Sequence, residues 1–171
     1  SKKIQVDNVG FQKEMEKSKS LARANWKGSG DKYLEERWFK IREELNPTEF
    51  LGYEFDKAEG VIIKISKNGE FVKSASTGDE IEIITNQTPF YGESGGQVGD
   101  EGHIFSSDCK IKVNDTQKKM GDLFIHYGKV EKGTISIGQS VNLEINVLKR
   151  NNSKANHTAT HLLHESLRRT L

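Results

Sequence analysis

The sequence predicts an α+β fold in which helices come first, a small antiparallel β-barrel follows, and one more helix comes last. Apolar residues recur every three or four positions before Pro47, alternate with polar ones after it, and return to the helical period near Lys154. These two changes of period predict three regions in the 171 residues: helical (1–46), β-barrel (47–149) and a C-terminal helix (150–171).

Two amphipathic helices are expected between about Phe11 and Leu45. Gly28, Ser29 and Gly30 separate them, Asp31 is a suitable N-cap for the second, and Pro47 marks its far end. The apolar positions on their buried sides are Phe11, Met15, Ala22 and Trp26, then Leu34, Trp38, Ile41 and Leu45.

After Pro47, short segments rich in β-branched and aromatic residues predict an antiparallel barrel without an evident repeat. Ile81 and Ile83 alternate with Glu80 and Glu82, as expected for strands with one buried and one solvated face. Asn68-Gly69 predicts a tight hairpin, because both residues tolerate positive φ. The expected strands are EFLGYEF, GVIIKI, EFVKSA, EIEIITN, CKIKV, LFIHYGKV and SVNLEINVL.

A glycine-rich stretch, TPFYGESGGQVGDEG, spans residues 88–102 between two expected strands. It lacks the GxxxxGK[ST] order of a phosphate-binding loop. Composition alone favours a barrel corner or bulge, because glycine permits sharp turns and close backbone approach.

The last predicted helix carries His157 and His161, which are four residues apart and therefore project from one face, with His164 nearby. Such a pair can bind one zinc ion, although HxxxH alone is more often not a metal site. Thr158 stands where metalloproteases carry a glutamate, so protease chemistry is unsupported. The possible helix caps are Asn151, Asn152 and Ser153.

A zinc site needs at least one more ligand. His126 and His103 are candidates only if the barrel folds back over the helix, and the single Cys109 is expected to be a small buried hydrophobe.

Composition is that of an ordinary soluble protein, with a net charge of +1 and 30% charged residues. One cysteine excludes an internal disulfide, and no apolar run could span a bilayer, so we expect a cytoplasmic protein that does not bind membranes. The end of the chain is basic and could face an acidic partner or be a solvated helical face. The start at Ser1 and the end at Leu171 suggest a piece of a longer protein.

Two motifs together, TPFYGESGGQVGD at 88–100 and NHTATHLLHESLR at 156–168, strongly resemble the alanyl-tRNA synthetase family where it leads into its editing domain. Residues 11–24 are similar to that family's linking helix, TEFLGY at 48–53 to its first barrel strand, and residues 126–141 to its strand pair before the histidine helix. The resemblance covers essentially the whole sequence.

The resemblance implies an enzyme that uses ATP and Mg²⁺, in a catalytic domain not contained here, to attach alanine to tRNA(Ala). It also implies a second site that hydrolyses tRNA(Ala) mischarged with serine or glycine. In that family an HxxxH pair, matching His157 and His161, and a later Cys-x-x-x-His bind zinc, while the glutamine of GGQ, here Gln97, lines the editing pocket. Residues 47–149 would then be the barrel of the editing region, and residues 150–171 the start of its core.

Because no Cys-x-x-x-His follows His161, we expect this segment alone to bind zinc weakly or not at all and to be inactive. Its expected partner is tRNA(Ala), and DNA is not expected to bind. Two alternatives remain: a free-standing editing hydrolase, which the helices before Pro47 disfavour, and a non-catalytic RNA-binding barrel module.

Overall fold

The computed structural model describes residues 37–38, 41–94 and 97–170. The chain divides into two compact units, Ser1–Trp38 and Phe39–Leu171. Most of the two helices expected before Pro47, including the proposed cap Asp31, lies outside the described residues, as do Gly95 and Gly96.

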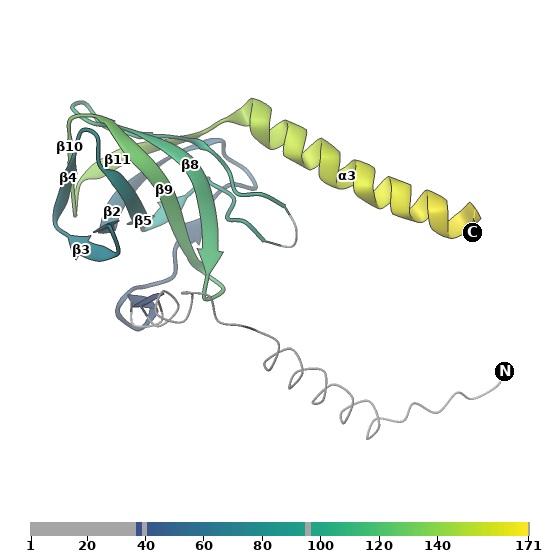
Figure 1. The fold of residues 1–171 in the computed structure, drawn as a ribbon, viewed down its shortest axis with the longest axis horizontal. Helices are drawn as coiled ribbons and strands as arrows, with labels where there is room; N and C mark the ends of the chain where they lie inside the picture. The colour runs from purple at the N-terminus through teal and green to yellow at the C-terminus, as the bar shows by residue number, and fades with distance from the viewer. Residues whose placement is uncertain (1–36, 39–40, 95–96, 171) are drawn as a thin grey trace, which may run out of the picture. The chain divides into compact units, whose positions relative to one another are not determined.

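The described residues of the second unit form a short helical turn at residues 41–44, eleven strands and one long helix. Figure 1 shows β8 and β9 as long neighbouring strands and α3 as one continuous helix. The elements are β1 Glu49–Phe50, β2 Lys57–Lys67, β3 Glu70–Val72, β4 Ser74–Ser76, β5 Glu80–Thr85, β6 Gln87–Thr88, β7 Gly102–Phe105, β8 Lys110–Lys119, β9 Leu123–Lys132, β10 Thr134–Ser136, β11 Ser140–Ile145 and α3 Val147–Thr170.

Six of these strands close into an antiparallel barrel in the order β2, β5, β9, β8, β7, β11 and back to β2. The closing ladder pairs Val141 with Gly60 and Leu143 with Ala58. Closure leaves no free edge among the six strands, which protects their backbone groups from pairing with other chains. The predicted α+β fold with a small barrel and a C-terminal helix is confirmed.

The barrel interior is filled mainly by β-branched side chains from alternate strand positions. Ile62, Ile83, Ile104 and Leu143 are fully buried and belong to one core cluster that also includes Cys109. Glu80 and Glu82 lie on the outer face of β5, while Ile81 and Ile83 lie inside. The predicted alternation and the predicted burial of Cys109 are therefore both confirmed.

The Asn68-Gly69 hairpin is also confirmed. Both residues have positive φ, 52° and 84°, and the strands on either side pair through Lys67 and Glu70. This is the conformation that matches the right-handed twist of the strands.

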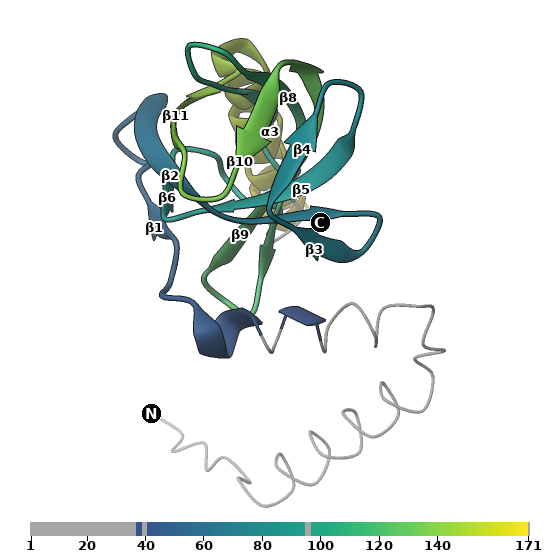
Figure 2. The same cartoon turned by 90° about the vertical axis from the view of Figure 1, so that its left-hand side faces the viewer.

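The turns that follow β4 and β10 have the same backbone arrangement. The short strands β4 and β10 pair with each other (Figure 2), and each is followed by a glycine with positive φ, Gly78 or Gly138. Asp79 then caps the backbone N–H of Ser76 just as Gln139 caps that of Ser136. Ser76 matches Ser136 and Gly78 matches Gly138, so the two turns share part of their sequence as well as their backbone, while the capping side chain differs.

The helix α3 begins earlier than predicted. It starts at Val147, and Asn146 is the N-cap, accepting the backbone N–H of Lys149 at 3.2 Å. The expectation that Asn151, Asn152 or Ser153 caps this helix is wrong, because all three lie within the helix. The apolar residues Val147 and Leu148, which the sequence pattern places in the preceding strand, form the first turn instead.

The helical turn at residues 41–44 is tied to the β8–β9 hairpin. Arg42 donates two hydrogen bonds to the carboxylate of Asp122, at 2.6 and 2.7 Å. The backbone N–H of Thr48 donates to the carbonyl of the same aspartate. Within the described ranges, no helix is both long enough and apolar enough to cross a membrane.

Candidate functional site

The glycine-rich stretch forms a loop with a closed neck. Tyr91 and Asp100 lie side by side there: the N–H of Asp100 donates to the carbonyl of Tyr91 at 2.9 Å, and the N–H of Tyr91 donates to Oδ2 of Asp100 at 2.7 Å. Nearer the tip, Ser94 and Gln97 exchange backbone hydrogen bonds. The backbone thus places Gln97 at the end of a stem made of two hydrogen-bonded segments.

Two glycines allow this stem to lie directly on β8. A Cβ at Gly99 would be 2.0 Å from the carbonyl oxygen of Thr116, and one at Gly92 would be 2.8 Å from Cβ of Lys118. The backbone N–H of Glu93 donates to the Thr116 carbonyl in the space so created. At these positions glycine is required for close approach of two backbones.

The helix α3 presents its histidines along one stripe. Ser153, His157 and Thr160 recur at spacings of four and three, and His161 follows one turn after His157. The Nε2 atoms of His157 and His161 are 2.9 Å apart, within hydrogen-bonding distance, so one ring donates its proton to the other. The two imidazoles therefore meet at a single point on the helix surface.

A pocket of about 460 Å³ lies between this stripe and the loop tip. Gln97 and Val98 form one wall, and the helix residues form the other. The structure thus brings the three sequence-predicted site residues, Gln97, His157 and His161, to one pocket. Ser153, Asn156 and Thr160 complete its lining.

Arg150, which no sequence pattern indicates as a site residue, joins the loop and the helix. Its side chain is only 4% exposed, and its Nε donates to Oδ2 of Asp100 at 2.9 Å, while Nη2 contacts the same oxygen. Its remaining donors reach the carbonyls of Gly52 and Pro89. Arginine is rarely buried, so its position in a basic stretch gave no signal of this role.

The other histidines considered as zinc ligands are engaged elsewhere. Both ring nitrogens of His126 are hydrogen-bonded inside the barrel, to the Ile83 carbonyl and the Thr88 hydroxyl. His103 lines a different pocket, beside Phe105 and Cys109. Neither residue lies with His157 and His161 on α3. The barrel does not fold back over the helix in the way that would make His126 or His103 a further zinc ligand.

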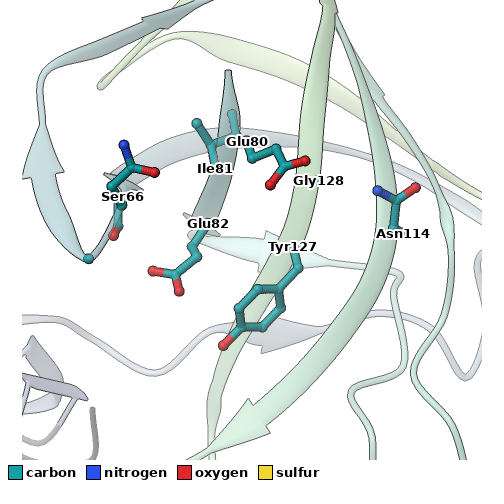
Figure 3. A pocket seen from close by; sticks show the side chains of 9 residues that line it. Ser66, Glu80, Ile81, Glu82, Asn114, Tyr127 and Gly128 are labelled. Carbon is teal, nitrogen blue, oxygen red and sulfur yellow. The ribbon is translucent and has the colours of Figure 1, made fainter. Parts of the chain in front are cut away.

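A further pocket, of about 350 Å³, opens on the outer face of the barrel (Figure 3). Its lining includes the carboxylates of Glu80 and Glu82, together with Asn114 and Tyr127. Carboxylates at this face would repel the phosphates of a nucleic acid. None of the sequence-predicted site residues lines it, so the pocket between Gln97 and α3 is the stronger candidate site.

In the described part of the chain, His157 and His161 are not joined by a third possible metal ligand. Residues 37–38, 41–94 and 97–170 contain no group of three or more His, Cys, Asp or Glu side chains arranged to hold a metal ion. Two imidazoles at adjacent turns suit zinc, which needs three or four protein ligands. Further ligands would have to come from outside the described residues.

Comparison with known proteins identifies the family of this chain. The family described as "tRNA synthetases class II (A)" matches residues 1–148. The chain therefore belongs to this family of class II tRNA synthetases.

Its relatives within the family are named alanine–tRNA ligases. The chain is 48% identical over 168 residues to the alanine–tRNA ligase of Chelativorans sp. and 50% identical over 168 residues to that of Nitrobacter winogradskyi, each alignment covering 98% of this chain. It is 48% identical over all of its length to the enzyme of Rhizobium meliloti. The chain spans 19% of the length of these relatives. The resemblance to alanyl-tRNA synthetase is thereby confirmed.

Proposed function

We propose that this chain belongs to the editing region of an alanyl-tRNA synthetase and that the pocket between Gln97 and α3 is part of its hydrolytic site. The whole protein would attach alanine to tRNA(Ala) with ATP and Mg²⁺ in a catalytic domain outside this sequence, and would act in the cytoplasm. The editing site would hydrolyse tRNA(Ala) that carries serine or glycine. A second site is needed because a pocket shaped for alanine rejects smaller or hydroxylated amino acids poorly.

One observation supports this proposal above the others: Gln97 and the pair His157 and His161 line the same pocket although they come from a loop and a distant helix. Convergence of a few polar groups in one concave site is typical of binding and catalytic pockets. A non-catalytic barrel module would have no need to bring an amide and two imidazoles together.

The chemistry of the pocket suits hydrolysis of an aminoacyl ester. The amide of Gln97 offers both donors and an acceptor, so it can hold the ester and amino groups of the substrate. While no metal occupies them, the imidazole nitrogens can hold the attacking water by hydrogen bonds. Gln97 would orient the ester, and the helix would present the groups that handle the water.

His157 and His161 would bind zinc when the remaining ligands are present, and the ion would then polarise the ester or activate water. The proton that the two Nε2 atoms share at 2.9 Å would be displaced when the metal binds. The described residues supply only two donors. We therefore propose that the segment by itself binds zinc weakly and neither charges nor deacylates tRNA.

The test uses the full-length enzyme that carries this segment. Release of serine from mischarged tRNA(Ala) is measured for the wild type and for Gln97→Ala, His157→Ala and His161→Ala, beside the rate of alanine charging. We expect all three substitutions to slow deacylation by roughly 10²-fold or more and to leave charging unchanged. A chelator should have the same effect as the histidine substitutions.

A matched control is His164→Ala. His164 lies on the same helix but does not line the pocket. If His161→Ala left deacylation unaffected, or if His164→Ala slowed it equally, the proposal that this pocket is part of the hydrolytic site would be contradicted. The gene region upstream of residue 1 provides a separate check, since a class II catalytic domain there distinguishes a synthetase from a free-standing editing hydrolase.

A further inference from the structure

We propose that the ion pair between Arg150 and Asp100 is the positioning device of this pocket: it sets the angle at which α3 presents its histidines to Gln97. The catalytic consequence rests on the function proposed above. The geometry of the pair stands independently of that function.

Asp100 holds the two ends of the glycine-rich loop together. One carboxylate oxygen, Oδ2, accepts the backbone N–H of Tyr91 and two donors from Arg150. The backbone carbonyl of Asp100 also accepts a hydrogen bond from the hydroxyl of Thr116 on β8, at 2.9 Å. The carboxylate that closes the neck of the loop is therefore the same one that holds the helix, and any movement of one is transmitted to the other.

Arg150 can set the orientation of α3 because it is the first residue on the side of the helix that faces the pocket. Arg150, Ser153, His157 and Thr160 follow one another at spacings of three and four, which places them on one side of α3. The arginine lies at the barrel end of this stripe, and the pocket-lining residues lie along the rest of it. The buried guanidinium and the histidines thus share one face of one rigid element.

Little else in the described residues holds α3 to the barrel. Arg150 is the one buried residue of this helix, and Leu162, Leu163 and Leu167 are exposed. The neighbouring ion pair of Lys149 with Glu101 is on the surface, with side chains 57% and 34% exposed. Orientation of the helix therefore depends on polar contacts in its first turn, and mainly on Arg150.

A small change at this anchor has a large effect at the pocket. The helix rises 1.5 Å per residue, so Cα of His157 lies about 10 Å from that of Arg150, and a tilt of about 10° moves it by about 2 Å. Misplacement of a catalytic group by 1 Å can slow a reaction by about 10²-fold. Positioning by the ion pair is therefore a requirement for catalysis and not only for stability.

The anchor needs the planar guanidinium and not just a positive charge. Arg150 donates in fixed directions to Asp100 and to the carbonyls of Gly52 and Pro89. A lysine ammonium can keep the charge but cannot reproduce this fork of donors. Arg150→Lys should therefore rescue part of what Arg150→Met loses.

The experiment compares neighbouring residues of the same helix in the full-length enzyme. The variants are Arg150→Met, Arg150→Lys and Asp100→Asn, with Lys149→Met as the matched control. The kinetic constants kcat and KM for deacylation of serine-charged tRNA(Ala) are measured together with the rate of alanine charging. Hydrogen exchange of residues 91–100 and 147–161 is compared with that of β2 and β9.

We expect Arg150→Met to lower kcat for deacylation by about 100-fold, with KM and charging nearly unchanged, and Arg150→Lys to fall in between. Exchange should rise in the loop and in α3 but not in β2 or β9. Combined with Gln97→Ala, Arg150→Met should have little further effect, because the alignment of the histidines with Gln97 is already lost in the single variant. If Arg150→Met unfolds the enzyme, the same pattern is required of Arg150→Lys and Asp100→Asn.

Three results would overturn the proposal: Arg150→Met behaving like Lys149→Met, exchange rising uniformly over the barrel, or full additivity with Gln97→Ala. Failure of the proposed function has a different signature. In that case Gln97→Ala leaves deacylation unchanged, while the exchange experiment still reports whether the ion pair holds the loop and the helix together.

Discussion

Nε2 of His126 accepts a hydrogen bond from the hydroxyl of Thr88 in the barrel interior, at 2.8 Å. This direction follows from the other ring nitrogen. Nδ1 is 3.1 Å from the carbonyl of Ile83, which can only accept, so Nδ1 carries the proton. Burial of the ring lowers the pKa of His126 to about 4, although the hydrogen bond to Ile83 acts in the opposite direction.

The first prediction is that acid destabilises the barrel through His126. Its pKa is about 4 in the folded state and about 6.5 in the unfolded chain, so the unfolded state binds more protons between these values. The contribution of His126 to the free energy of unfolding is therefore fully present above pH 6.5. It is lost as the pH drops towards 4, by about 3 kcal/mol in total. Urea unfolding at several pH values measures this change.

The control for this prediction is His103→Gln, because His103 is not buried. It should leave the pH dependence in place, whereas His126→Gln should lower stability at neutral pH and flatten the slope between pH 4 and 6.5. An unchanged slope in His126→Gln would assign the acid sensitivity to other groups.

The second prediction concerns Gly99. Because a Cβ there would be 2.0 Å from the Thr116 carbonyl, Gly99→Ala must push the loop away from β8. We expect a loss of about 1–3 kcal/mol in the free energy of unfolding and slower deacylation in the full enzyme. Val98→Ala, at a neighbouring residue that is 63% exposed, should cost little. Equal stability of the two variants, measured by thermal melting, contradicts the prediction.

The third prediction separates the buried ion pair from the exposed one beside it. Arg150→Ala leaves the buried carboxylate of Asp100 without its cation and should cost about 3–5 kcal/mol. Lys149→Ala removes the surface partner of Glu101 and should cost at most about 1 kcal/mol. Chemical denaturation of both variants provides the comparison, and similar losses would show that burial is not what gives the Arg150 pair its strength.

The fourth prediction tests where α3 begins. Asn146→Ala removes the cap and should destabilise the protein by about 1 kcal/mol. Asn151→Ala replaces an exposed residue inside the helix with a better helix former and should stabilise it by up to about 0.5 kcal/mol. Circular dichroism melts distinguish the two, and the opposite order would restore the cap to residues 151–153.

The barrel could be predicted because its signals are local. Alternation at residues 80–83 and the Asn68-Gly69 turn report directly on burial and backbone conformation. The start of α3 could not be predicted, since Val147 and Leu148 favour a strand as readily as a helix. The start of the helix is decided by contacts in the folded protein: the Asn146 cap and the hydrogen bonds of Arg150 stabilise a helix that begins at Val147.

The candidate site shows the same division. The spacing of His157 and His161 is enough to place both rings on one helix face. Their meeting with Gln97 depends on an ion pair between residues far apart in the chain, Asp100 and Arg150. Neither residue has a pattern around it that indicates burial, so the pairing becomes visible only in three dimensions.

The ladder between β2 and β11 also has a consequence for synthesis of the protein. The first long strand of the barrel finds its last partner only in residues 140–145. A nascent chain emerging from the ribosome therefore cannot complete the barrel until β11 has left the exit tunnel, and until then β2 presents an unpaired edge. Arg150 follows within a few residues, so barrel closure and docking of the histidine helix become possible at nearly the same point in translation.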